Sequence, residues 1–428
     1  MGGMGLIVRS ASPWAGGIPP ARMLMSLVAE HAATLPRLHR LRDYYEGRHA
    51  IGDRRRMSGL PNNSLVHAFP RYICTMTAGY LIGSPVRYGA RGQEAGLAAV
   101  ADAFSRCAMD AVDAELARDA AVYGKGVELL FLDGAGRPRS AAVKPTQAFV
   151  VYTDDVETAP LLGVRGTPVL NPDGTADGWR FDVYTRETAL CYRMKEPCEE
   201  GFAAPVSASR HFFGGVPMVE FWNGDDEKGD FENVISLIDA YDFLQSDRMN
   251  DKQQFVDALL VLYGCTLETD ADGRTPGRQL REDKAIALPD GDARAEFLCK
   301  QLNEADTEVL KASINADIHK MCMVPDMTDV HFAGNSSGVA MRYKLLGLEQ
   351  LTRIKERWFR EGLRERVRLY GRYLTMLGAP EIDPENVEFQ FTRALPVNEL
   401  EVAQTASELR GLVSDEKLEK RVEAAIGL

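Results

Sequence analysis

Residues 338–378 read GVAMRYKLLGLEQLTRIKERWFREGLRERVRLYGRYLTMLG and carry the strongest structural signal in the chain. Its apolar residues recur three or four positions apart, which places them on one face of a helix. The spacing predicts one amphipathic helix of about 40 residues and about 60 Å. Such a length indicates a structural spine, an elongated molecule or an assembly. The apolar stripe comprises Leu348, Leu351, Ile354, Trp358, Leu363, Val367, Tyr370, Leu374 and Leu377.

The same stretch is strongly basic, although the whole chain has a net charge of −12. Some of its charges can pair along the helix, as in Glu349 with Arg353 and Glu365 with Arg368. The basic residues together suit contacts with acidic neighbouring subunits or contacts with DNA, and we favour the contacts with subunits. The basic residues are Arg342, Lys344, Arg353, Lys355, Arg357, Arg360, Arg364, Arg366, Arg368 and Arg372.

Length and composition describe a globular protein with several domains. A chain of 428 residues allows about two to four domains. The negative charge argues against tight nucleic-acid binding over the whole surface but leaves room for basic patches. Seven cysteines without a C-x-x-C pair favour reduced thiols over a disulfide framework. No apolar run approaches the roughly 18 residues of a membrane span.

The order of elements along the chain predicts an α+β fold. Helical patterns at 23–45, 70–82 and 95–123 follow a flexible N-terminal arm, with a basic loop at 48–63. Short β-branched and aromatic runs between 127 and 222 predict an antiparallel meander. Helical patterns then flank a β-like insert at 259–297, which the two helices would present at one end. The remaining expected elements are the 338–378 helix, a strand at 387–391 and an acidic helical tail from 398.

Motifs for catalysis or metal binding do not appear. Residues 124–126 lack the spacing of a P-loop, and residues 268–279 have Gln279 where an EF-hand loop needs glutamate. The histidines show no zinc spacing. The run Asp225-Asp226-Glu227 suits a turn better than a cation site. We therefore expect no catalytic residue, no cofactor and no metal.

Three ordered segments resemble the portal proteins of long-tailed bacteriophages. They are residues 41–51 (LRDYYEGRHAI), residues 61–67 with 80–86 (PNNSLVH and YLIGSPV), and residues 336–349 (SSGVAMRYKLLGLE). Three unrelated matches in order are more specific than one motif. The resemblance implies a portal fold and a ring, typically of twelve subunits, at one capsid vertex. DNA would be packaged and later ejected through its central channel.

The resemblance also implies a division of the chain into the parts of a portal subunit. A β-containing wing precedes a stem of two helices, which flank a clip. A tunnel loop, the long spine helix of the wing and a helical crown follow. The implied ranges are 1–230 for the wing, 231–257 for the first stem helix, 258–302 for the clip, 303–325 for the second stem helix, 326–338 for the tunnel loop, 339–378 for the spine helix and 379–428 for the crown.

A DNA channel must attract DNA weakly, because tight phosphate contacts would stall transport. The first stem helix carries six acidic and two basic residues, which suits such a wall, although a solvated helix face is the alternative. Ser336 or Ser337 also suits the N-cap of the long helix. The channel candidates are His331, Asn335, Ser336 and Ser337 in the tunnel loop, and Asp247, Arg248, Asp251, Lys252, Lys311 and Lys320 in the stem.

A portal of this kind implies a set of partners and a location. The partners are other copies of the chain, double-stranded DNA, the large subunit of terminase, a head–tail adaptor, and the major capsid and scaffolding proteins, with no membrane. The implied location is the portal vertex of the virion, after assembly in the bacterial cytoplasm. Packaging energy would come from a separate ATPase.

Two other interpretations remain open from the sequence. The first is another capsid-associated structural protein, such as an adaptor or minor head protein, although adaptors are shorter and lack the helix–insert–helix pattern. The second is a metal-dependent nuclease that uses an acidic cluster such as Asp225 and Asp226. Mutation of either aspartate in a magnesium-dependent assay would separate this enzyme from a structural protein.

Overall fold

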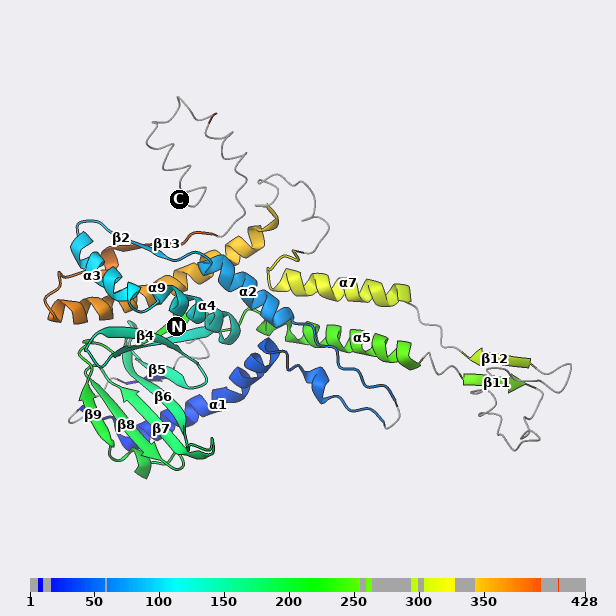
Figure 1. Ribbon diagram of the computed structural model, residues 1–428, viewed down its shortest axis with the longest axis horizontal. Helices are drawn as coiled ribbons and strands as arrows, with labels where there is room; N and C mark the ends of the chain where they lie inside the picture. The colour runs from blue at the N-terminus through cyan, green and yellow to red at the C-terminus, as the bar shows by residue number, and fades with distance from the viewer. Residues whose placement is uncertain are drawn as a thin grey trace. The chain divides into compact units, whose positions relative to one another are not determined.

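The computed structural model describes residues 7–10, 17–57, 60–254, 259–263, 294–298, 304–327, 343–393 and 407. These residues belong to two compact units. The first lies within Met1–Arg48, Ala68–Ile235 and Ile318–Leu428, and the second within His49–His67 and Ser236–Asp317. Helices and mainly antiparallel strands occur together (Figure 1), which confirms the predicted α+β class.

The larger sheet of the first unit has six strands in the order β1-β5-β6-β7-β8-β9. β1 is parallel to β5, and the other neighbouring pairs are antiparallel. Helix α1 (Ala21–Tyr45) packs Leu24 and Leu27 against Phe149 and Val151 on one face. The predicted meander is confirmed from β5 to β8, and β9 adds a strand that was not predicted. The strands are β1 (Ile7–Arg9), β5 (Ala148–Thr153), β6 (Pro160–Leu170), β7 (Ala176–Tyr184), β8 (Thr188–Met194) and β9 (Ser207–Arg210).

A second sheet packs on the opposite face of β5. It has the order β10-β3-β4, and its residues Val127 and Met218 share a core with Ala148 and Val150. The prediction of one continuous meander was therefore wrong. β10 pairs with β3, although the two strands are far apart in the chain. The sequence PRSAAV of β4 lacks the β-branched pattern that is typical of strands. The strands are β3 (Lys125–Leu132), β4 (Pro138–Val143) and β10 (Met218–Trp222).

Helices cover the outer face of this second sheet. The predicted helix at 95–123 is two helices, because Ala108 adopts a left-handed conformation with φ of 49°. No glycine or proline announces this break in the sequence. At its end, Gly124 (φ 92°) stops the helix where a Cβ atom would lie 1.9 Å from the Glu227 carbonyl oxygen. The helices are α2 (Phe69–Ile82), α3 (Glu94–Ser105) and α4 (Met109–Tyr123).

The long helix predicted at 338–378 is present as α9 (Leu346–Met376), whose 31 residues are fewer than expected. Leu363, Val367 and Tyr370 are buried as predicted, and they pack on β3 and β10 in the largest core. The predicted stripe was wrong at two positions, because Ile354 and Leu377 are 49% and 62% exposed. After α9, β13 (Val387–Gln390) pairs with β2 (Arg87–Ala90), which confirms the strand predicted there.

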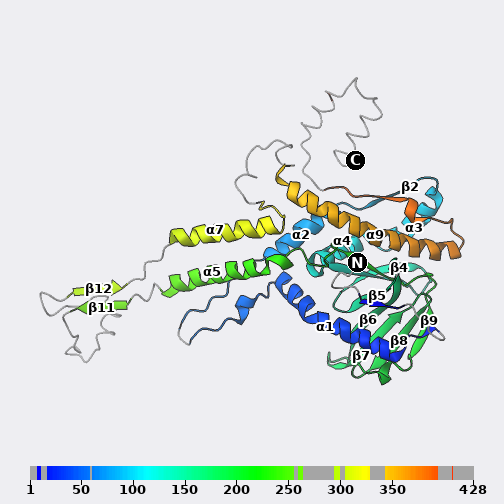
Figure 2. The ribbon, with the colours of Figure 1, turned by 180° about the vertical axis from the view of Figure 1, so that it is seen from behind.

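The second unit contains most of two helices and a strand pair. α5 (Ile235–Gln254) and α7 (Glu304–Met321) run side by side in both ribbon views (Figures 1 and 2). β11 (Leu259–Tyr263) and β12 (Arg294–Leu298) pair with each other in antiparallel register. The helix–strand pair–helix order is as predicted. Most of the expected clip, tunnel loop and crown lies outside the described residues.

Candidate functional site

One face of α5 is polar and yet fully buried. Asp242, Ser246 and Asn250 lie four residues apart, so they share a face of the helix, and each has an exposed fraction of zero. Buried polar groups are costly unless they are hydrogen-bonded. The partners come from residues 49–57 and 60–67 of the same unit, which we call the clamp segment.

Asp242 holds both ends of the clamp segment. The Nδ1 atom of His49 lies 2.6 Å from Asp242 Oδ2, and the backbone N–H and Nδ1 of His67 both lie 2.8 Å from Oδ1. Burial alone raises the pKa of the Asp242 carboxyl, but the hydrogen bonds from His49 and His67 outweigh it and leave the pKa below its usual value. An ionised carboxylate only accepts hydrogen bonds, so both Nδ1 atoms act as donors.

The stabilisation that Asp242 contributes depends on pH in a defined direction. Its pKa is lower in the folded chain than the ordinary 3.8. The contribution is therefore present above the unfolded pKa and is lost as the pH falls through the folded value. The clamp segment is thus expected to release from α5 only in strong acid.

The remaining contacts extend along α5 with a regular spacing. The backbone N–H of Leu65 donates to Ser246 Oγ at 2.9 Å, and the N–H and Nδ2 of Asn63 donate to Asn250 Oδ1 at 2.7 and 2.8 Å. Every second residue of this part of the clamp segment, 63, 65 and 67, binds α5, while their partners recur about once per helical turn. This match holds the segment along one face of α5.

Basic side chains of the clamp segment also contact α5. Arg54 and Arg56 both form ion pairs with Asp247, and the Arg54 guanidinium lies 5.5 Å from the centre of the Phe243 ring. These contacts place Asp247, a predicted channel residue, beside two cations of its own subunit. Sequence reasoning missed the clamp because its partners are far apart in the chain, although the polar positions 242, 246 and 250 were a detectable signal.

The structure brings two other predicted channel residues together. Arg248 of α5 donates to Glu308 of α7, and Lys311 Nζ lies 2.8 Å from the same carboxylate. Hydrogen bonds from Lys311 and then Arg248 hold the pKa of Glu308 below its usual value. This cluster links α5 and α7 through a single acid.

The other predicted channel residues are not gathered into this cluster. Asp251 and Lys252 lie in the last turn of α5, half-buried and exposed respectively, and Lys320 is exposed near the end of α7. The expected acidic wall was wrong at Asp242, which is buried against two histidines. The tunnel-loop candidates His331, Asn335, Ser336 and Ser337 lie outside the described residues.

Two bases of α9 are buried in the first unit. The Nε of Arg366 donates to both oxygens of Glu128 at 2.9 and 2.8 Å, and Nη1 lies 2.6 Å from Asp113 Oδ1 without hydrogen-bond alignment. Lys355 pairs with the buried Asp230. Arg366 and Lys355 are therefore unavailable to DNA or to a neighbouring subunit, which corrects the interpretation of the whole basic stripe as a contact surface.

Asp113 makes the stability of this buried cluster dependent on pH. Burial raises its pKa to about 6, the positive charge of Arg366 opposes the rise, and the charge of Glu128 adds to it. Because the folded pKa lies above the unfolded one, its stabilising contribution is greatest in acid and is lost as the pH rises through about 6.

The variant Asp113→Asn mimics the protonated acid and cannot titrate. As the pH rises from 4 to 7, we expect the wild type to lose up to about 3 kcal/mol of unfolding free energy relative to the variant. Urea unfolding of both proteins across that range measures the difference. A constant difference at every pH would contradict the assignment.

The comparison with protein families matches residues 25–424 to the family described as phage portal protein, SPP1 Gp6-like. The match covers most of the chain, so the chain belongs to this family of phage portal proteins. Members of the family are structural proteins of the phage particle and not enzymes, which confirms the first of the three interpretations.

Two portal proteins are similar to the chain. That of Bacillus phage SPP1 is 23% identical over 429 residues, which cover 94% of this chain and 82% of that protein. That of Clostridium phage phiCD119 is 25% identical over 208 residues, which cover 48% of this chain and 44% of that protein.

Two solved structures show a weaker likeness. They are described as the neck of an empty GTA particle computed with C6 symmetry and the neck of a native GTA particle computed with C12 symmetry. Their TM-scores are 0.43 and 0.45 at 15% and 12% identity; each alignment covers 83% of this chain, and 88% and 90% of the respective neck chains. Because both scores are below 0.5, the assignment depends on the sequence comparisons.

The clamp gives a physical meaning to two of the segments that resemble portal proteins. Residues 49–51 begin it, and residues 61–67 carry Asn63, Leu65 and His67, which bind α5. Ser64 donates to the carbonyl oxygen of Ile51 at 3.1 Å and ties the two segments together.

Among the described residues, no helix has the length and apolar character that a bilayer span needs.

Proposed function

We propose that the chain forms a closed ring, typically of twelve copies, that conducts double-stranded DNA through one vertex of a phage capsid. The family match over residues 25–424 carries this proposal. A ring arises when one surface of a subunit binds a different surface of the next and the rotation closes. DNA would enter during packaging and leave through the same channel.

In this proposal α5 and α7 form the stem of the channel. Arg248 and Lys311 supply cations that are already paired with Glu308, and Asp247 is paired with Arg54 and Arg56. Paired cations bind phosphate weakly, because each new contact must compete with the existing ion pair. The side chains facing DNA are proposed to be Asp247, Arg248, Asp251, Lys252, Lys311 and Lys320.

The clamp segment has a mechanical role in this proposal. It fixes α5 through buried hydrogen bonds that involve side chains of three successive helical turns, so the helix cannot rotate without breaking them. A stem helix held in this way presents the same face to passing DNA. We further propose that residues 258–302 form the clip that docks terminase and later the head–tail adaptor, and that the wing contacts capsid and scaffolding proteins.

The mass of the purified protein in solution tests the ring directly. Twelve copies of the 47.3 kDa chain give a mass of about 570 kDa. We expect this mass by native mass spectrometry, and a central hole in electron-microscope averages. A protein that stays at 47.3 kDa at high concentration and in the presence of its scaffolding protein would contradict the ring.

A further inference from the structure

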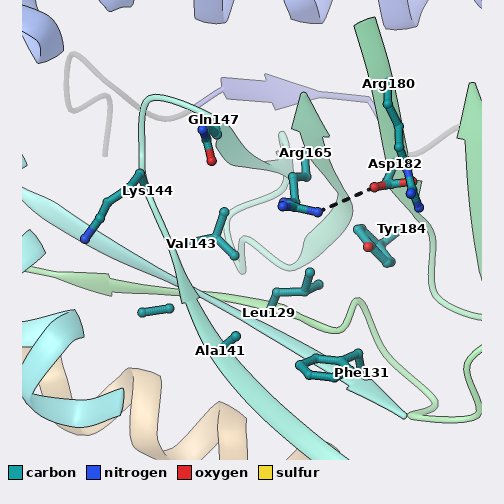
Figure 3. A pocket seen from close by; sticks show the side chains of 11 residues that line it. Leu129, Phe131, Ala141, Val143, Lys144, Gln147, Arg165, Arg180, Asp182 and Tyr184 are labelled. Atoms are coloured by element: carbon teal, nitrogen blue, oxygen red, sulfur yellow. Dashed lines mark hydrogen bonds and ion pairs between the residues drawn. The ribbon is translucent and has the colours of Figure 1, made fainter. Parts of the chain in front are cut away.

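A cavity of about 420 Å³ lies in the first unit between the two sheets. Figure 3 shows its lining, with Arg165 of β6 and Arg180 of β7 on one side and Leu129 and Phe131 of β3 on the other. Its lining residues lie between positions 129 and 184 and therefore outside the ranges assigned to the stem. Its size and its mixture of polar and apolar walls are typical of a binding site.

The polar side of the cavity has more positive than negative charge. Arg180 Nε donates to Asp182 at 2.9 Å, while Arg165 approaches the same carboxylate only to 3.8 Å. The Nε of Arg165 is buried and has no hydrogen-bond partner within the described part of the chain. Two guanidinium groups thus share one acid, which leaves this side of the cavity with an excess positive charge for an incoming anion.

A third cation at the rim is already neutralised. Lys144 Nζ lies 2.9 Å from both Glu115 and Asp119, and Figure 3 shows it directed away from Asp182. The anion-binding capacity of the cavity therefore comes from the two arginines. Tyr184 lies beside them, and burial raises its pKa to about 12, so its phenol remains a hydrogen-bond donor at neutral pH.

The apolar side of the cavity lies next to an open strand edge. Phe131 is 42% exposed, which is unusual for a phenylalanine in a sheet. β4 is the last strand of its sheet, so its outer edge has no strand partner among the described residues, and its lining residues Ala141 and Ala142 are small. An open edge accepts an extended peptide, and small side chains leave room for it.

We propose that this cavity binds an extended acidic peptide segment of a partner protein. A carboxylate of the peptide would pair with Arg165 and Arg180, and a neighbouring apolar side chain would cover Phe131. Nucleic acid fits less well, because duplex binding needs a row of phosphate contacts and the cavity offers two arginines beside an apolar wall. This inference concerns the wing surface and does not depend on ring formation.

The probe is a library of short random peptides selected on the immobilised full-length protein. We expect the pool to be enriched in sequences with Asp or Glu next to an aromatic or aliphatic residue. A selected peptide with a fluorescent label should bind the wild type at least about tenfold more tightly than the double variant Arg165→Met/Arg180→Met. Replacing the acid of the peptide by its amide should give the same loss.

Two further variants keep the test decisive if the double variant is unstable. Phe131→Ala leaves all charges in place and should weaken binding severalfold, whereas Arg210→Met, on exposed strand β9 outside the cavity, should not change it. A pool without acidic enrichment would overturn the proposal. So would equal binding to Phe131→Ala and wild type, or selective loss of binding to a DNA duplex in the double variant.

Discussion

Replacing Arg366 by methionine is expected to lower the free energy of unfolding by about 3–5 kcal/mol. Arg366 is fully buried, and its guanidinium is the positive group in contact with Glu128 and Asp113. Methionine fills much of the same volume but leaves two buried carboxyl groups without a counter-charge. Globular domains are stable by only about 5–15 kcal/mol, so much of the margin would be lost. Thermal and urea unfolding of the purified variant measure the effect.

The exposed Arg357 on the same helix provides the matched control. Arg357→Met changes the same side chain on the solvent side of α9 and should alter stability by less than about 0.5 kcal/mol. The triple variant Arg366→Met/Glu128→Gln/Asp113→Asn should recover part of the loss, because it removes the uncompensated charges. Equal stability of Arg366→Met and Arg357→Met would show that the buried cluster does not support the fold.

Replacing Asp242 by asparagine is expected to release the clamp segment from α5. The carboxylate accepts hydrogen bonds from His49 and His67, whereas an amide has one acceptor oxygen and places a donor against a donor. Losing hydrogen bonds to a charged group costs about 2–3 kcal/mol. Local opening should therefore become about 30–150 times more frequent.

Hydrogen exchange at the backbone amides of Asn63, Leu65 and His67 reports this opening directly. All three amides donate to side chains of α5, so all three should lose protection together in Asp242→Asn. The control is Asp239→Asn, which changes a half-buried carboxylate of the same helix and should leave these amides protected. Unchanged exchange in Asp242→Asn would mean that the clamp does not depend on this carboxylate.

Helices and most strands could be predicted because local patterns specify them. The 3.6-residue repeat of α9 and the alternation in β5 to β8 appear in the sequence without any tertiary information. The sequence also carried the segments that resemble portal proteins, and the family match confirmed that resemblance. The errors occurred where a local pattern was absent, as in β4, or where packing overrode it, as at Ala108.

The candidate site was less accessible to prediction, because charge in a sequence does not reveal exposure. Arg366 and Lys355 read as members of a basic stripe, yet each is buried against acids from other elements. Asp242 read as part of an acidic wall, yet it joins the two ends of the clamp segment.

The element order, the α+β class and the family could be inferred from the residues alone, because these depend on periodicity and on residues that are neighbours in the chain. Which of the charges are paired became clear only from the folded arrangement. A buried ion pair such as Arg366 with Glu128 joins residues more than 200 positions apart. No local pattern encodes such a pairing, since its energy arises only when folding removes both groups from water.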